Sequence, residues 1–234
     1  SMFAIKDIVS DAMHLFYPHI CTGCGSDLIS KDSLLCLSCI NDLPHTHFAE
    51  FADNPIERIF TGRLPVRAAH SEFYFSKGQL LQQLIHLLKY KNNKEIGHYL
   101  GELMGNSILK SSRFSNIDYL VPLPLYPDKE FKRGYNQSEI ICNGIQAATR
   151  IPVMVKNVIR QRPTETQTRK HRAERWQNVE GSFSIENPGS LTGKNILLVD
   201  DVITTGASLE ACAREILKIP GTTISFAALA HASK

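Results

Sequence analysis

Several features that would place this chain in a special class of protein are missing from its sequence. It has no run of about 18 apolar residues, so a transmembrane helix is excluded. Its first residues lack a basic region followed by a long apolar stretch, so we expect no secretory signal and a cytoplasmic location. The net charge of +3 does not support bulk binding to nucleic acid, and 43% hydrophobic residues is too many for a disordered chain. With 234 residues, the chain can form one ordinary domain and a small module.

Motifs that carry a catalytic nucleophile or a histidine metal site are also missing. The nine histidines form no HExxH or H-x3-H pattern, and there is no recognisable Ser/His/Asp or Cys/His set. Any enzymatic activity of this chain must therefore depend on binding and electrostatics rather than on a dedicated nucleophile.

Four of the six cysteines are concentrated near the start of the chain. They form two C-x2-C pairs separated by eleven residues: Cys21, Cys24, Cys36 and Cys39. Two such pairs can supply four thiolates to one tetrahedral ion, and a reducing compartment disfavours disulfides. We predict a structural zinc module in residues 1–50, with an iron–sulfur centre as the alternative. An amphipathic helix at 3–17 is expected to pack against this module, or else to lie on a membrane.

The remaining residues, 51–234, alternate between strand and helix patterns after a polar, loop-like stretch at 45–64. Strands are predicted at 66–75, 119–121, 153–155, 196–199 and 223–229, and helices at 78–90, 96–108, 138–148 and 208–217. Strands separated by helices predict an α/β domain with a mainly parallel sheet flanked by helices. Ligands of such sheets bind beyond the carboxyl ends of the strands.

The strongest site signal follows the apolar strand that ends at Val199. Two adjacent acids, Asp200 and Asp201, come first, and a loop of small and hydroxyl residues, 204–208, then opens a helix. Small residues let backbone N–H groups approach an anion, and the helix N-terminus adds positive potential. The acids suit hydroxyl groups or Mg²⁺. The segment therefore fits a ribose 5-phosphate, although a plain helix cap preceded by two solvated acids is the alternative.

This segment closely resembles the motif with which type I phosphoribosyltransferases bind phosphoribosyl pyrophosphate (PRPP). Residues 121–124 (VPLP), 133–139 (RGYNQSE), 166–167 (TQ) and 172–183, together with the four cysteines, make nearly the whole chain similar to the ComF family. These are phosphoribosyltransferase-like proteins linked to natural competence and DNA uptake. The resemblance implies a type I phosphoribosyltransferase fold and the binding of PRPP with Mg²⁺.

The same resemblance assigns roles to individual residues. Asp200 and Asp201 would act in catalysis and contact the ribose hydroxyls, directly or through metal. The PRPP-binding segment would comprise Asp200, Asp201, Val202, Ile203, Thr204, Thr205, Gly206, Ala207 and Ser208, of which the last five would hold the 5-phosphate. Pro122, Leu123 and Pro124 would form the pyrophosphate loop; a proline-stiffened strand exit is the alternative.

Two basic regions could bind pyrophosphate or a nucleic-acid backbone. The first comprises Arg133, Tyr135, Asn136 and Gln137, with Lys129 and Lys132 nearby. The second is the stretch 156–175, which holds seven basic and two acidic residues and includes Arg169, Arg172 and Arg175. It is predicted to be a hood over PRPP or a wall for single-stranded DNA, with Tyr135 and Trp176 as stacking surfaces. Solvated surface is the alternative for both regions, and in the first region Asn136 would then cap the following helix.

Two functions therefore remain open. The ComF-like motifs favour a protein of DNA uptake that binds PRPP and single-stranded DNA and works with other competence proteins. The alternative is an active phosphoribosyltransferase that transfers ribose 5-phosphate from PRPP to a nucleobase or amine. Such a transfer passes through an oxocarbenium-like state and requires no nucleophile from the protein.

Overall fold

The computed structural model describes residues 19–27, 33–75, 79–161 and 182–232. The predicted helix at 3–17 lies outside the described residues, as do Arg169, Arg172, Arg175 and Trp176 of the basic stretch. No helix within the described ranges is both long and apolar enough to cross a membrane.

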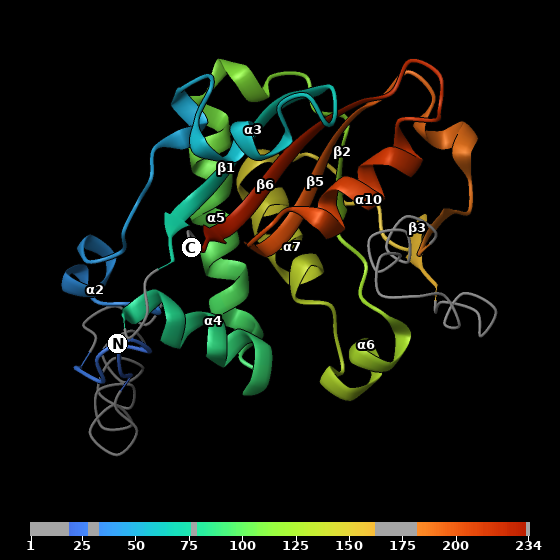
Figure 1. The fold of residues 1–234 in the computed structure, drawn as a ribbon. Helices are drawn as coiled ribbons and strands as arrows, with labels where there is room; N and C mark the ends of the chain where they lie inside the picture. Colours follow the sequence, from blue (N-terminus) through green and yellow to red (C-terminus); the bar gives the residue numbers. More distant parts are fainter. Residues whose placement is uncertain (1–18, 28–32, 76–78, 162–181, 233–234) are drawn as a thin grey trace, which may run out of the picture.

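Four strands form the central sheet, and all of their pairings are parallel. In spatial order they are β1 (Val66–Tyr74), β6 (Thr223–His231), β5 (Asn195–Ile203) and β2 (Tyr119–Pro122) (Figure 1). Val199 of β5 lies opposite Pro122 of β2 and Ala227 of β6, so the carboxyl ends of these strands meet at one edge. The prediction of an α/β fold with a parallel, helix-flanked sheet is confirmed.

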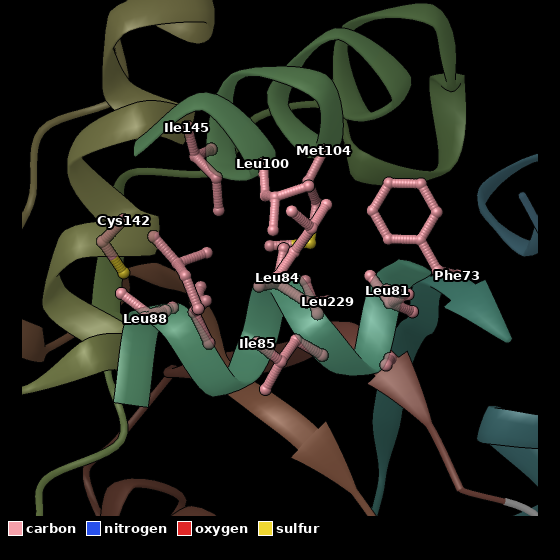
Figure 2. Packing of buried hydrophobic residues seen from close by; sticks show 14 of the residues in the cluster. Phe73, Leu81, Leu84, Ile85, Leu88, Leu100, Met104, Cys142, Ile145 and Leu229 are labelled. Atoms are coloured by element: carbon pink, nitrogen blue, oxygen red, sulfur yellow. The ribbon is translucent and has the colours of Figure 1, made fainter. Parts of the chain in front are cut away.

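The two faces of the sheet are covered by different helices. One face packs against α4 (Leu80–Tyr90), α5 (Lys94–Lys110) and α7 (Gln137–Thr149), and the other against α3 (Pro55–Phe60) and α10 (Ala207–Ile216). Figure 2 shows Leu84 of α4 facing Leu100 and Met104 of α5, all three fully buried. Because both faces are covered, the centre of β5 is continuously apolar, as the sequence predicted for a buried parallel strand.

Helices α5 and α7 approach each other closely through glycines. A Cβ atom built on Gly101 would clash with the backbone oxygen of Ile141, and one built on Gly144 would clash with the backbone oxygen of His98. Gly97, Gly101 and Gly105 recur every four residues, so they line one side of α5. This spacing in the sequence is a signal for close helix packing.

Gly144→Ala is expected to destabilise the protein by about 3 kcal/mol, because the clash is with backbone that cannot rotate away. Chemical denaturation followed by circular dichroism measures this free energy of unfolding. Gly189→Ala is the matched control, since its added methyl group would lie 3.5 Å from the nearest side-chain atom. Equal stability of the two variants would contradict the close packing of α5 and α7.

Several local expectations differ from the structure. The stretch 45–64, predicted to be loop, contains the 3-10 helix η1 (Phe48–Glu50) and α3, which begins at Pro55 after its cap Asn54. Helix α6 (Pro127–Arg133) was not predicted at all, although Pro127 opens it and Gly134 closes it. Both helices are bounded by residues that typically begin or end a helix, but both are too short to show a clear apolar period in the sequence.

The predicted strand at 153–155 is wrong, because only Val153 pairs with the sheet, through a single bridge to Leu120. Pro152 has no N–H to donate to a ladder, and Lys156 has a left-handed backbone. The strands of this region are instead β3 (Val158–Arg160) and β4 (Phe183–Ile185), an antiparallel pair on either side of 162–181. The other described elements are α2 (Leu37–Asn41), η2 (Ser112–Phe114) and η4 (Pro188–Leu191).

Candidate functional site

The loop between β5 and α10 has the geometry expected of an anion-binding turn. Gly206 has a φ of 74°, in the left-handed region that favours glycine, and it immediately precedes α10. A Cβ atom at this position would lie 2.8 Å from the Phe60 ring of α3. Thr204 and Thr205 are exposed, and their backbone N–H groups have no acceptor within the described part of the chain. These donors at a helix N-terminus are therefore available to a ligand.

The two acids lie inside the last part of β5 rather than after it, and their environments differ. Asp200 is half-buried, and its Oδ1 accepts hydrogen bonds from the Asp201 N–H (2.8 Å) and, more weakly, from the Ser138 hydroxyl (3.4 Å). Burial, and then the adjacent charge of Asp201, raises the pKa of Asp200 to about 7. Asp200 is thus poised to exchange a proton near neutral pH.

Asp201 is 5% exposed, and both of its carboxylate oxygens are engaged. Oδ1 accepts a hydrogen bond from the Val202 N–H (2.6 Å). Oδ2 forms an ion pair with Nζ of Lys89, 2.8 Å away in the last turn of α4, and this buried oxygen has no hydrogen-bond partner among the described residues. Lys89 was not predicted to belong to the site, because Lys89, Tyr90 and Lys91 were interpreted as an ordinary basic helix end. Only the fold brings this lysine to β5.

The segment Pro122, Leu123 and Pro124 lies at the same sheet edge as Asp200. The Leu123 N–H donates to the Val199 carbonyl (2.8 Å), which extends the pairing of β2 with β5. The Leu123 carbonyl in turn accepts a hydrogen bond from the Asn136 side chain (3.0 Å). The same side chain caps α7 by accepting from the Ser138 N–H (2.9 Å), so Asn136 joins the turn to the helix.

The first basic region is only partly available to a ligand. Tyr135 is 8% exposed and its hydroxyl donates to the Leu88 carbonyl, so the prediction that it is a stacking surface is wrong. Gln137 is buried and accepts a hydrogen bond from Arg133, whose guanidinium lies 5.7 Å from the centre of the Tyr90 ring. Two other aromatic side chains, Tyr90 of α4 and Phe131 of α6, are exposed; 66% of the Tyr90 surface and 89% of the Phe131 surface is accessible to solvent.

The four predicted metal ligands come together in the N-terminal module. The Sγ atoms of Cys21, Cys24, Cys36 and Cys39 all lie within 4.8 Å of one another, and no other group of three or more metal-binding side chains occurs in the described ranges. Cys24 and Cys36 are 3.6 Å apart, far longer than a disulfide bond of about 2.05 Å. Tetrahedral zinc with Zn–S bonds of about 2.3 Å needs sulfurs about 3.8 Å apart, so the cluster fits zinc.

The local backbone prepares these thiols for a metal. The backbone N–H of Cys36 donates to the Cys21 sulfur (3.2 Å), and that of Cys39 to the Cys36 sulfur (3.5 Å). The Ser26 hydroxyl, followed by its backbone N–H, lowers the pKa of Cys24 to about 6, whereas burial and the neighbouring thiols raise the pKa of Cys39. Thiolate is therefore already favoured at part of the site.

The module is attached directly to the sheet. Leu35 and Leu43 belong to the same buried cluster as α4 and α5. Thr46 donates its N–H to the Glu72 carbonyl (3.0 Å), and His45 bridges to Phe73 of β1 in antiparallel orientation. The contacts of the described part of 1–50 thus cross the predicted domain boundary.

The fold and the site define a class of protein. The family model described as "Phosphoribosyl transferase domain" matches residues 146–234, which include β5, the acid pair, the 204–208 loop and α10. The chain thus has a phosphoribosyltransferase-like α/β domain preceded by a four-cysteine cluster that could bind a metal such as zinc.

Individual known proteins resemble the chain over more of its length than the family model does. The chain is 26% identical to "Competence protein F" of Haemophilus influenzae over 94% of this chain and 93% of that protein. It is 29% identical to "DNA utilization protein YhgH" of Shigella flexneri over 62% of this chain, and the match spans 64% of the length of YhgH. Among solved structures, adenine phosphoribosyltransferase of Leishmania tarentolae aligns with a TM-score of 0.40 and 12% identity, covering 72% of this chain and 94% of that one. The chain is thus similar to competence protein F over nearly its whole length and to YhgH over the part that the two chains share.

Proposed function

We propose that this protein binds PRPP with Mg²⁺ at the carboxyl edge of its sheet and acts in the uptake or use of DNA. The observation that carries the proposal is the meeting of three features at one edge: the open N–H groups before α10, the half-buried Asp200, and the turn at 122–124. The names of two relatives, competence protein F and DNA utilization protein, support the second part of the proposal.

The residues of the site divide between the parts of the ligand. The loop donors and the hydroxyls of Thr204, Thr205 and Ser208 bind the 5-phosphate. Asp200 accepts hydrogen bonds from the ribose hydroxyls, and its carboxylate is also an oxygen ligand of the kind that Mg²⁺ prefers. When bound, this ion neutralises charge on the diphosphate. In this proposal the turn at 122–124, which lies at the same sheet edge as Asp200, binds the diphosphate.

The same arrangement supports an active phosphoribosyltransferase as the second candidate. In that reaction the bond from C1 of the ribose to the diphosphate breaks, the diphosphate leaves, and the acceptor nitrogen bonds to C1. The described residues can hold ribose and phosphate without supplying a nucleophile, so they suit binding with turnover as well as binding alone.

Calorimetric titration with PRPP, with and without Mg²⁺, tests the shared part of both candidates. Pyrophosphate release is then measured in the presence of purine, pyrimidine and amine acceptors. Binding without release supports the DNA-uptake role, and release with one acceptor supports the transferase. A chain that binds no PRPP at millimolar concentration would contradict both.

The basic stretch gives a separate prediction for single-stranded DNA. Replacing Arg169, Arg172 and Arg175 by alanine is expected to weaken binding of an oligonucleotide and to lower the slope of log affinity against log salt by about 2. Fluorescence anisotropy at several salt concentrations measures both effects. Alanines at Arg67, Lys110 and Lys194, outside the stretch, should leave the slope unchanged. Equal slopes for both variants would contradict the assignment.

A further inference from the structure

The paired acids of β5 are not equivalent, although the sequence resemblance gives both the same role. Both oxygens of Asp201 are occupied, by the Val202 N–H and by Lys89, and its side chain is 7% exposed. In Asp200 only Oδ1 has hydrogen-bond donors, and the residue is half-buried. A ribose hydroxyl can therefore reach a carboxylate oxygen of Asp200 without displacing a partner. Neither carboxylate oxygen of Asp201 is available in this way.

The ion pair between Lys89 and Asp201 is built into the fold. The neighbouring Leu88 is fully buried, and its carbonyl accepts the hydroxyl of Tyr135. This hydrogen bond fixes the backbone at the end of α4. The Lys89 side chain therefore extends to β5 from a fixed position. The Lys89 side chain is itself only 21% exposed. Such a pair differs from a surface salt bridge, whose long side chains must be ordered in water.

The charges explain why the site needs this lysine. Two carboxylates beside a phosphate-binding loop would repel a ligand that carries several negative charges. Lys89 cancels one of them. An ammonium group has three donors, so its ion pair with Asp201 leaves N–H groups available to an anionic oxygen.

We propose that Lys89 is a ligand-binding residue of this site and that Asp201 is a positioning residue that holds Lys89 rather than a ribose ligand. The inference rests on the proposed function and goes beyond it, because it separates the roles of the two acids. The ligand class is a phosphorylated pentose, bound through Asp200 at its hydroxyls and through Lys89 at its anionic oxygens.

The test uses the full chain, with ribose 5-phosphate without metal and PRPP with Mg²⁺ as probes. Lys89→Met combined with Asp201→Asn leaves no buried charge of this pair uncompensated, and it is expected to lower the affinity for ribose 5-phosphate about tenfold. Asp201→Asn alone should weaken binding because Lys89 loses its anchor, but in the Lys89→Met background it should have no further effect. Lys89→Arg keeps the charge and should recover most of the affinity, and Lys91→Met is the control on the same helix end.

Each outcome decides between the claims. If the wild type binds neither probe, the proposed function fails and this inference fails with it. If the wild type binds and the double variant binds equally well, with an unchanged melting temperature, only the inference is overturned. If Asp201→Asn weakens binding as much in the Lys89→Met background as it does in the wild type, Asp201 contacts the ligand itself and the inference is also overturned.

Discussion

Asp200→Asn is expected to lower the affinity for PRPP about 100-fold while leaving the protein folded. Two hydrogen bonds from ribose hydroxyls to a carboxylate contribute about 1.5 kcal/mol each, and the amide that replaces it cannot accept them equally well. Isothermal titration calorimetry measures the loss. Asp118→Asn is the control, because Asp118 accepts the Asn195 N–H at the opposite end of the same strand. An unchanged affinity in Asp200→Asn would remove Asp200 from the site.

The same carboxyl gives the affinity a pH dependence with a defined sign. Because the folded protein raises the pKa of Asp200 to about 7, the carboxylate that accepts hydroxyls is lost as the pH falls through 7, and PRPP binding should weaken. The phosphate groups of the ligand titrate near pH 6 as well. The Asp200→Asn variant corrects for this, since it retains only the part of the pH dependence that belongs to the ligand.

Stability should change in the opposite direction from affinity. The ordinary pKa of an aspartate is about 3.9, so the folded state favours the protonated carboxyl between about pH 4 and pH 7. The contribution of Asp200 to the free energy of unfolding is therefore present at low pH and is lost as the pH rises through 7. At pH 8, Asp200→Asn should melt at the same temperature as the wild type or higher. A lower melting temperature would show that the carboxylate supports the fold.

Removal of the metal should have the second large effect. Native mass spectrometry is expected to show one zinc ion per chain, and Cys36→Ser is expected to lose it. Cys36 supplies one of the four sulfurs and also caps α2 by accepting the Cys39 N–H. Without the metal, Leu35 and Leu43 should leave the main core. Burial of two leucines contributes about 3–6 kcal/mol, so the free energy of unfolding should fall by several kcal/mol.

Ser38→Ala controls for the zinc experiment, because Ser38 is exposed between two of the ligands and its backbone contacts are unchanged by the substitution. It should retain the zinc and the wild-type stability. Freshly purified wild-type protein with no bound metal, or a visible absorption band of an iron–sulfur centre, would contradict the zinc assignment.

The features that the sequence predicted well are those that local patterns encode. The short, fully apolar run Ile196–Val199 is typical of a strand buried on both faces, and it forms the centre of β5. The C-x2-C pairs likewise lie close together in the chain, so their assembly depends on short loops alone. The 204–208 loop combines small residues with a helix start, and its φ of 74° at Gly206 agrees with that interpretation.

The features that were missed depend on contacts between distant segments. Tyr135 stands in a polar motif, and only the fold shows that its ring is buried and its hydroxyl reaches α4. Lys89 looked like an ordinary cation at a helix end, because nothing near it in the sequence indicates Asp201. Asn136 was predicted either to contact a ligand or to cap the following helix; it caps α7, and its contact with the turn after β2 was not predicted. Local polarity alone does not separate binding from structural roles.

The hydrogen bond from Thr46 to Glu72 and the bridge from His45 to Phe73 bear on how the protein can be divided. These residues occupy the outer side of β1, the strand at the margin of the sheet. A shortened chain that starts at residue 51 would uncover part of that margin, together with the apolar surface beneath Leu43. Uncovered edge strands can pair with strands of other chains, so such a fragment should self-associate. Ligand binding by the phosphoribosyltransferase-like portion should therefore be measured with the cysteine module in place.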